Sequence, residues 1–145
     1  MGVIKTDYKI ERCANEEEAE FIDESLYQFN LATVPVREDA ETYAVQRKAV
    51  DAEGNIIGGC LGLGIAWDFG FIDILWVDEA YRGQGIGSAL LAEVEGVLKE
   101  NCNLVYLDTF DWQAKDFYEK QGYTVFGTLE DCPKGHCKYF MKKVF

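Results

Sequence analysis

A glycine-rich segment at residues 83–87 is the part of this sequence best suited to binding chemistry. It reads Arg82-Gly83-Gln84-Gly85-Ile86-Gly87-Ser88 and stands between an apolar segment and an amphipathic one. The first amides of a helix have no intrahelical partners and lie at the positive end of its dipole, so such a turn can hold a phosphate without a lysine. The segment therefore predicts a phosphate site, while a turn that only packs a helix on a sheet stays the alternative.

Two common phosphate ligands do not fit this spacing. A nucleoside triphosphatase loop ends in Gly-Lys-Ser/Thr, whereas Gly87 is followed directly by Ser88. A dinucleotide loop reads G-x-G-x-x-G, whereas Gly83, Gly85 and Gly87 are each two apart. Asp108, about twenty residues further on, stands where that fold places its ribose-binding acid, but the glycine register is wrong. We expect neither triphosphatase chemistry nor NAD binding.

Periodicity predicts the elements that position this turn. Residues 8–12 alternate as a short strand, and Asn15 starts a helix that runs to about Asn30, with Glu18 at capping-box spacing. Its apolar residues repeat every three or four positions and predict one buried stripe: Ala19, Ile22, Leu26 and Phe29. Further strands are expected at residues 43–51, 56–66, 71–77, 104–110, 124–129 and 138–144. Helices are expected from Ile86 to near Asn101 and over residues 113–121, the second closed by Gly122.

This element order predicts the fold class. Antiparallel strands come first, a strand–helix–strand unit lies in the middle, and a β-pair closes the chain. We expect an α/β (α+β) architecture with a mixed, mostly antiparallel sheet flanked by helices, in a single domain over residues 1–145. The 145 residues leave no room for a second domain behind a linker.

Two motifs resemble the GNAT superfamily of acyl-CoA-dependent N-acetyltransferases. Arg82-x-x-Gly85-x-Gly87 resembles that family's pyrophosphate loop, and the segment from Ala114 to Tyr123 resembles its A-x-x-F-Y-x-x-x-G-F/Y segment. The resemblance implies a GNAT-like fold, transfer of acetyl from acetyl-CoA to a primary amine by direct attack in a ternary complex, and these cofactor-binding residues: Leu75, Trp76, Val77, Arg82, Gly83, Gln84, Gly85, Ile86, Gly87, Ser88, Asp111, Ala114 and Tyr118. Asp111 stands where the family usually has asparagine. A non-catalytic module that binds or senses acyl-CoA is the alternative.

The resemblance also implies catalytic roles. Tyr118 stands at the position of the family's general acid. Val77 stands at the position whose main-chain amide faces the thioester carbonyl in the family. Asp73 stands where many relatives carry glutamate as the base. Proton donation from a tyrosine of pKa ~10 to a thiolate of pKa ~8.5 is uphill. Simple alternation would put Asp73, Leu75 and Val77 on one face of their strand. Asp68, Asp108 and Asp111 are further acidic candidates for attracting a cationic acceptor.

Composition limits the partners and the location. A formal charge of −12 and a pI near 4.4 disfavour nucleic acid and anionic membrane surfaces and favour cationic ligands. The longest apolar run is shorter than the ~20 residues that span a bilayer, and the N-terminus lacks a secretion signal, so we expect a cytoplasmic protein. Cys132, His136 and Cys137 are too few for a tetrahedral zinc site, and we expect no metal. Edge strands and late aromatic residues would suit a homodimer.

Overall fold

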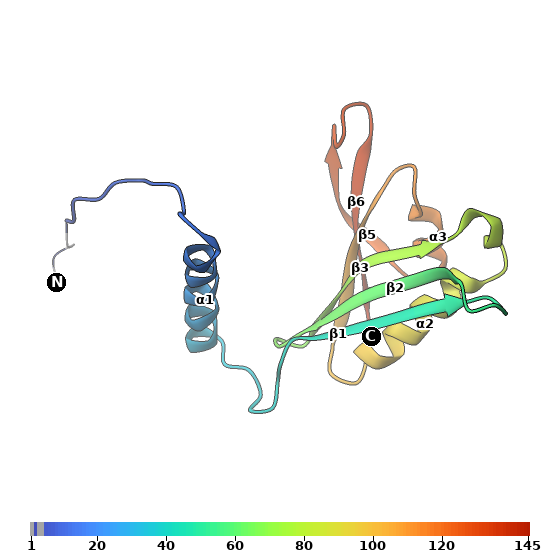
Figure 1. The fold of residues 1–145 in the computed structure, drawn as a ribbon, viewed down its shortest axis with the longest axis horizontal. Helices are drawn as coiled ribbons and strands as arrows, with labels where there is room; N and C mark the ends of the chain where they lie inside the picture. Colours follow the sequence, from blue (N-terminus) through green and yellow to red (C-terminus); the bar gives the residue numbers. More distant parts are fainter. Residues whose placement is uncertain (1, 3–4) are drawn as a thin grey trace. The chain divides into compact units, whose positions relative to one another are not determined.

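The computed structural model of the chain describes residue 2 and residues 5–145. They divide into two compact units, one ending at Arg37 and one formed by Glu38–Phe145 (Figure 1). The cavity described below lies wholly within the second unit. Among the described residues, no helix is both long and apolar enough to cross a membrane.

The first unit consists of an extended segment and helix α1 (Glu16–Thr33). As predicted, Asn15 caps this helix: its side-chain oxygen accepts a 3.0 Å hydrogen bond from the Glu18 amide, while the Glu18 carboxylate accepts from the Ala14 amide. The strand predicted at residues 8–12 is wrong: no strand is formed there, and the sheet of the described residues consists of strands of the second unit alone. The apolar residues of α1 repeat at the predicted positions, but none of them is buried.

The second unit is built on a six-stranded sheet. Its strands are β1 (Tyr43–Val50), β2 (Ile56–Ile65), β3 (Phe69–Val77), β4 (Leu104–Phe110), β5 (Thr124–Glu130) and β6 (Cys137–Val144). They lie in the order β1-β2-β3-β4-β6-β5, and every neighbouring pair is antiparallel except β3 and β4 (Figure 1). The predicted mixed, mostly antiparallel sheet is therefore confirmed, with each strand within a few residues of its expected bounds.

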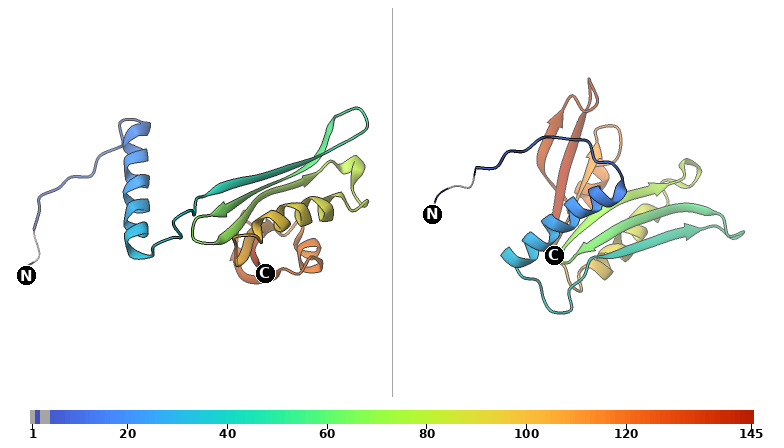
Figure 2. Two further views of the ribbon diagram at one scale, coloured as in Figure 1. Left: turned by 90° about the horizontal axis from the view of Figure 1, so that it is seen from below. Right: turned by 60° about the vertical axis from the view of Figure 1, so that its left-hand side comes forward.

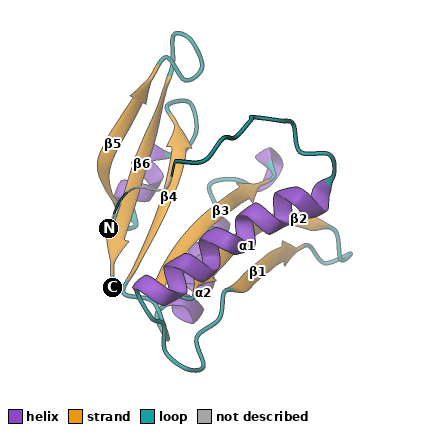
Figure 3. Cartoon of the chain, turned by 90° about the vertical axis from the view of Figure 1, so that its left-hand side faces the viewer, coloured by secondary structure: helices purple, strands orange, loops and turns teal. Residues whose placement is uncertain are grey.

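The parallel pair at the centre of the sheet is short. β3 and β4 pair only where Phe69–Phe71 faces Leu104–Tyr106. Beyond that point the two strands part, as Figure 3 shows, and the C-terminal halves of β3 and β4 are left without each other's hydrogen bonds. The opening between them contains backbone groups that a ligand can reach.

Helix α2 (Ile86–Leu98) covers one face of β1, β2 and β3 (Figure 2). Its apolar side buries Leu90, Leu91, Val94 and Leu98 against the sheet. A fully buried Leu or Val side chain contributes about 1.5–3 kcal/mol, so this stripe anchors the glycine turn that precedes the helix. The packing is close: a Cβ added to Gly62 of β2 would lie 2.9 Å from Val94 Cγ1.

Helix α3 (Lys115–Lys120) is shorter than the predicted helix over residues 113–121. Gln113 is not helical because its side-chain oxygen accepts a 2.8 Å hydrogen bond from the Phe110 amide, which closes the turn after β4. Gly122 follows the helix with a φ of 95°, as a left-handed C-terminal cap requires. This confirms the predicted end of the helix.

Candidate active site

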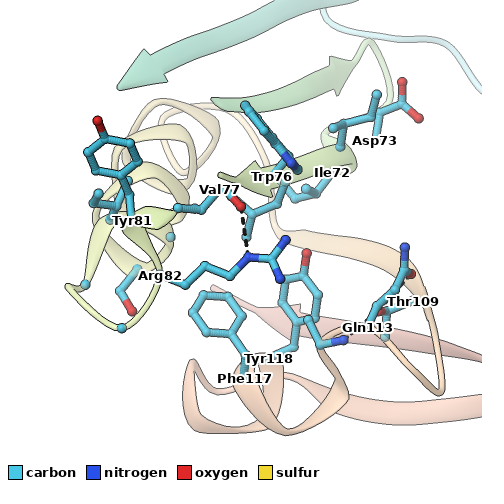
Figure 4. Close-up of a pocket in the computed structure, with 18 of the residues that line it drawn as sticks. Ile72, Asp73, Trp76, Val77, Tyr81, Arg82, Thr109, Gln113, Phe117 and Tyr118 are labelled. Atoms are coloured by element: carbon cyan, nitrogen blue, oxygen red, sulfur yellow. Dashed lines mark hydrogen bonds between the residues drawn. The ribbon is translucent and has the colours of Figure 1, made fainter. Parts of the chain in front are cut away.

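A cavity of about 740 Å³ occupies the opening between β3 and β4 (Figure 4). Its walls come from three parts of the chain: the C-terminal half of β3 with the glycine turn, the end of β4 with the turn after it, and the start of α3. Most of the predicted cofactor-binding residues line it, namely Leu75, Trp76, Val77, Arg82, Gly83, Gly85, Ile86, Gly87, Ser88, Ala114 and Tyr118. The sequence-predicted residues are therefore brought together, with two exceptions.

The glycine turn leaves the first amides of α2 free. A short 3-10 helix, η1 (Glu79–Tyr81), leads into it, and Gly83 and Gly85 have φ angles of 81° and 82°, which disfavour any residue with a side chain. Gly85 caps α2 without a side-chain hydrogen bond, and the first helical turn holds no acidic residue. These donors and the helix dipole favour an anion such as a diphosphate.

The turn and α3 are joined by direct contacts. Gln121 donates a 3.1 Å hydrogen bond from its side-chain amide to the Ser88 hydroxyl. The Phe117 ring packs against Gly87, where an added Cβ would lie 3.6 Å from its Cζ atom. Residues from the two sequence motifs thus fix the geometry of the same wall.

Arg82 supplies a cation to this end of the cavity. Its Nε atom donates a 2.9 Å hydrogen bond to the Val77 carbonyl oxygen, drawn as a dashed line in Figure 4. The guanidinium is therefore held beside the last residue of β3. Its remaining donors can contact a phosphate on the ligand.

Tyr118 belongs to the cavity wall and to the core at once. The residue is 6% exposed, and Figure 4 shows its hydroxyl on the side of the ring that faces β3. Burial raises its pKa above the ordinary value, with further contributions from the Cys60 thiol and the Asp108 carboxylate. At neutral pH, Tyr118 is thus a neutral phenol that can donate a hydrogen bond or a proton.

Asp73 is an extra residue in the β2–β3 ladder. Ile74 pairs with Leu61 and Ile72 pairs with Gly62, so Asp73 has no partner on β2. The bulge breaks the alternation expected from the sequence: Leu75 and Val77 pack against the core, as buried Ile72 does. The prediction that a continuous alternation sets the direction of Asp73 is therefore wrong, although its side chain still lines the cavity.

Two predicted cofactor-binding residues do not line the cavity: Gln84 and Asp111. The Asp111 carboxylate instead accepts a 2.9 Å hydrogen bond from His136 Nδ1 and a 3.0 Å hydrogen bond from the Cys137 amide. Desolvation raises the pKa of Asp111, but these hydrogen bonds and the histidine charge outweigh it and lower the pKa overall. Asp111 joins the turn after β4 to the loop before β6.

Sequence reasoning missed several residues that the structure places in the wall. Thr109, Trp112 and Gln113 lie at the end of β4 and in the following turn, and Tyr81 lies in η1. The only sequence signal for Trp112 was that a large aromatic residue stands in an expected turn, where it is not needed to fill the core. Asp68, which was an acidic candidate, is not among the lining residues, whereas Asp108 is.

Cys132, His136 and Cys137 lie near one another in sequence, but the structure does not arrange them as ligands. Among residue 2 and residues 5–145, no group of three or more histidine, cysteine, aspartate or glutamate side chains is placed to hold a metal ion. His136 is directed to Asp111 instead.

The fold and the cavity define a protein in which a helix N-terminus with free main-chain donors opens into a cavity between two parting strands, an arrangement suited to an anionic ligand. Comparison with known families agrees: residues 6–123 match the Acetyltransferase (GNAT) family, and the chain belongs to that family. It is an acyl-CoA-dependent N-acetyltransferase that uses acetyl-CoA as co-substrate. The free donors of the glycine turn fit the diphosphate of that co-substrate.

Three relatives illustrate the similarity. The chain is 31% identical to blasticidin-S acetyltransferase from Streptomyces morookaense over 115 residues, which cover 78% of this chain and 84% of the relative. It is 30% identical to the acetyltransferase Atu2258 from Agrobacterium fabrum over 133 residues, 91% of this chain and 94% of the relative. A crystal structure of an acetyltransferase from Bacillus cereus superposes with a TM-score of 0.85 at 37% identity, covering 94% of this chain and 98% of that one.

Proposed function

We propose that this protein transfers the acetyl group of acetyl-CoA to the primary amine of a small, cationic acceptor by direct attack within a ternary complex. The observation that carries the proposal is the separation of charge along one cavity. At the end formed by the glycine turn, free amides and Arg82 offer positive potential, whereas Asp73 and Asp108 line the other part of the wall. A negatively charged co-substrate and a positively charged acceptor would each meet the opposite charge.

Strand geometry separates the two regions. Asp73 and Val77 are four residues apart on β3, which is ~13 Å along an extended strand. The parted strands leave the Val77 main chain free of β4, so its amide can bind the thioester carbonyl oxygen. The acceptor would approach from the side of Asp73.

In this proposal Tyr118 acts on the departing sulfur. The amine nitrogen forms a bond to the thioester carbon, the carbon–sulfur bond breaks, and the thiolate receives a proton. Tyr118 is the buried neutral phenol in the wall, and its hydrogen bond would stabilise the negative sulfur. Because the pKa of Tyr118 is raised, its hydroxyl would first donate a hydrogen bond to the sulfur and would transfer the proton only afterwards.

Asp73 is proposed as the base for the acceptor amine. Its carboxylate has no ion pair or hydrogen bond among the described residues, and it lines the cavity. Aspartate reaches one methylene less far than glutamate, so we expect it to take the proton of the attacking amine through a water molecule. We propose transfer with no covalent acyl-enzyme, and the proposal is supported by the position of Tyr118 and Asp73 in the wall of one cavity.

The named substrate of one relative supports a small-molecule acceptor. That relative is called a blasticidin-S acetyltransferase. Blasticidin S therefore belongs in the first panel of acceptors for this protein, together with polyamines, aminoglycosides, amino acids and lysine peptides.

Release of free thiol from acetyl-CoA in the presence of this panel tests the proposal. We expect release that depends on an amine and a product heavier by one acetyl group in the mass spectrum. A protein that binds CoA, as shown by calorimetry, but acetylates no amine in the panel would instead be the non-catalytic acyl-CoA-binding module. Asp73→Asn should remove one ionisation from the pH dependence of kcat/KM, and an unchanged pH profile would reject the base.

A further inference from the structure

Trp112 presents a fixed aromatic surface to the cavity. The residue lines the wall and is 54% exposed. One face of its indole is stacked on Phe110, with ring centroids 4.5 Å apart and planes inclined by 3°. Phe110 therefore supports the indole from one side, while about half of the residue stays exposed.

The surroundings of Trp112 hold it in place before any ligand arrives. The His136 ring packs against it in a T-shaped arrangement, with centroids 4.9 Å apart and planes inclined by 81°. His136 is itself fixed by the 2.9 Å hydrogen bond to Asp111. Lys138 Nζ lies 4.8 Å from the centre of the Phe110 ring beneath. A side chain already held in one conformation loses little entropy on binding, which favours a ligand that stacks on it.

Trp76 adds a second exposed indole to the same wall. It is 46% exposed at the end of β3. Figure 4 shows the side chains of Trp76 and Asp73 on the opposite side of β3 from Phe117 and Tyr118. Both indoles line the same cavity, which favours a small molecule as their occupant.

The charged groups near these indoles include carboxylates and cations, and one of the carboxylates has no cationic partner among the described residues. Asp73 has no cationic partner among the described residues, and the Asp108 carboxylate forms an ion pair with Lys138, with Oδ1 3.6 Å from Nζ. Arg82 is turned to the Val77 carbonyl. A cation over an indole face gains electrostatic energy from the ring, and a flat cation also gains contact over its whole area.

We propose that the acceptor carries a planar, positively charged ring next to its primary amine, and that this ring stacks on the exposed part of the Trp112 indole, in the cavity that Trp76 and Asp73 also line. This inference rests on the proposed function and adds the chemical class of the acceptor to it. A tetrahedral cation of equal charge would meet the carboxylates but would cover less of the indole.

Two synthetic amines with the same fixed ring charge differ in ring shape, and they are compared at equal concentrations of the neutral primary amine, because the pyridinium ring lowers the basicity of its aminomethyl group. 4-(Aminomethyl)-1-methylpyridinium is a flat cation, and 4-(aminomethyl)-1,1-dimethylpiperidinium has the same fixed charge on a puckered ring. We expect kcat/KM, measured by thiol release, to be at least about 10-fold higher for the pyridinium, with the difference mainly in KM. Trp112→Leu should reduce that ratio to below about 3-fold, while Asp73→Asn should weaken both amines and leave the ratio intact.

Trp67→Leu is the matched control, because this tryptophan lies outside the cavity wall. It should keep the wild-type ratio. Saturable quenching of tryptophan fluorescence by the pyridinium, without acetyl-CoA, should be present in wild type and in Trp67→Leu and lost in Trp112→Leu. Equal kcat/KM for the two amines, or a ratio that survives in Trp112→Leu, would overturn the inference while other amines are still acetylated. If no amine in any panel is acetylated, the proposed function itself fails.

Discussion

The rings of Tyr118 and Tyr123 lie against each other in the core, with centroids 5.5 Å apart and planes inclined by 66°. Tyr123 is 2% exposed and donates a 2.6 Å hydrogen bond to the Glu95 carboxylate of α2. Lys143 of β6 donates a second one, at 2.9 Å, to the same carboxylate. The proposed proton donor therefore rests on a buried polar network that joins α2 to the end of the sheet.

Removal of the Tyr123 hydroxyl should destabilise the protein more than it changes the chemistry. In Tyr123→Phe the Glu95 carboxylate, which is 5% exposed, loses one of its two donors. We expect the free energy of unfolding in urea to fall by about 1–3 kcal/mol. Tyr106→Phe, a change on a half-buried tyrosine of β4, is the control and should leave the free energy within about 0.5 kcal/mol. Equal stability of Tyr123→Phe and wild type would contradict the network.

Loss of the Tyr118 hydroxyl should act on the rate. Tyr118→Phe keeps the ring packing and removes only the proposed hydrogen bond to sulfur, so kcat should fall about 10²–10⁴-fold while the Kd for acetyl-CoA changes little. Steady-state kinetics with calorimetry separates the two quantities. An unchanged kcat would eliminate this role for Tyr118.

The pH profile gives a second test of Tyr118. Burial, the Cys60 thiol and the Asp108 carboxylate all raise the pKa of Tyr118 above its ordinary value near 10. The phenol therefore stays protonated up to at least about pH 10, and kcat should show no alkaline decline from Tyr118 below that pH. A decline that begins near pH 8 and disappears in Tyr118→Phe would contradict this assignment.

A side chain at Gly85 should weaken co-substrate binding. Gly85 has a φ of 82° and open space where a Cβ would stand, so Gly85→Ala introduces backbone strain of roughly 1–2 kcal/mol and a methyl group beside the diphosphate. We expect KM for acetyl-CoA to rise about 10-fold. Gly135→Ala is a matched control, since Gly135 has a φ of 83° and the same open space but lies in the loop before β6. Similar KM values for the two variants would mean that strain alone explains the effect.

Asp111 should make the loop before β6 sensitive to acid. Desolvation raises the pKa of Asp111, but its hydrogen bonds lower it overall, so the folded pKa lies below the unfolded value of ~3.9. Its contribution to stability is then present above that value and lost as the pH falls through the folded pKa. Asp111→Asn should flatten the dependence of unfolding free energy on pH below about 4. Asp116→Asn, at an exposed carboxylate without a hydrogen bond or ion pair among the described residues, should keep the wild-type dependence.

The sequence allowed most of the fold and the position of the glycine turn to be predicted, because those parts depend on local patterns. Alternation located the strands of the second unit, and the glycines at 83, 85 and 87 located the turn. The Asp73 bulge could not be predicted, since it depends on the register of β2 against β3. Residues 8–12 show the same limit: their alternation is real, but a strand needs a partner that the sequence does not name.

The acceptor end was harder to predict because it is assembled from distant segments. Asp111 matched a co-substrate position by sequence, yet its carboxylate is turned to His136 and Cys137, 25 and 26 residues away. Trp112 became informative only when its stacking on Phe110 and its place in the cavity were known. No local pattern reports such contacts.

A crystal structure of the protein with acetyl-CoA tests the central claim most directly. The account predicts diphosphate oxygens within hydrogen-bonding distance of the main-chain amides between Gly83 and Ser88, the thioester beside Val77, and the sulfur near the Tyr118 hydroxyl. Diphosphate density bound away from the N-terminus of α2 at saturating acetyl-CoA would contradict it.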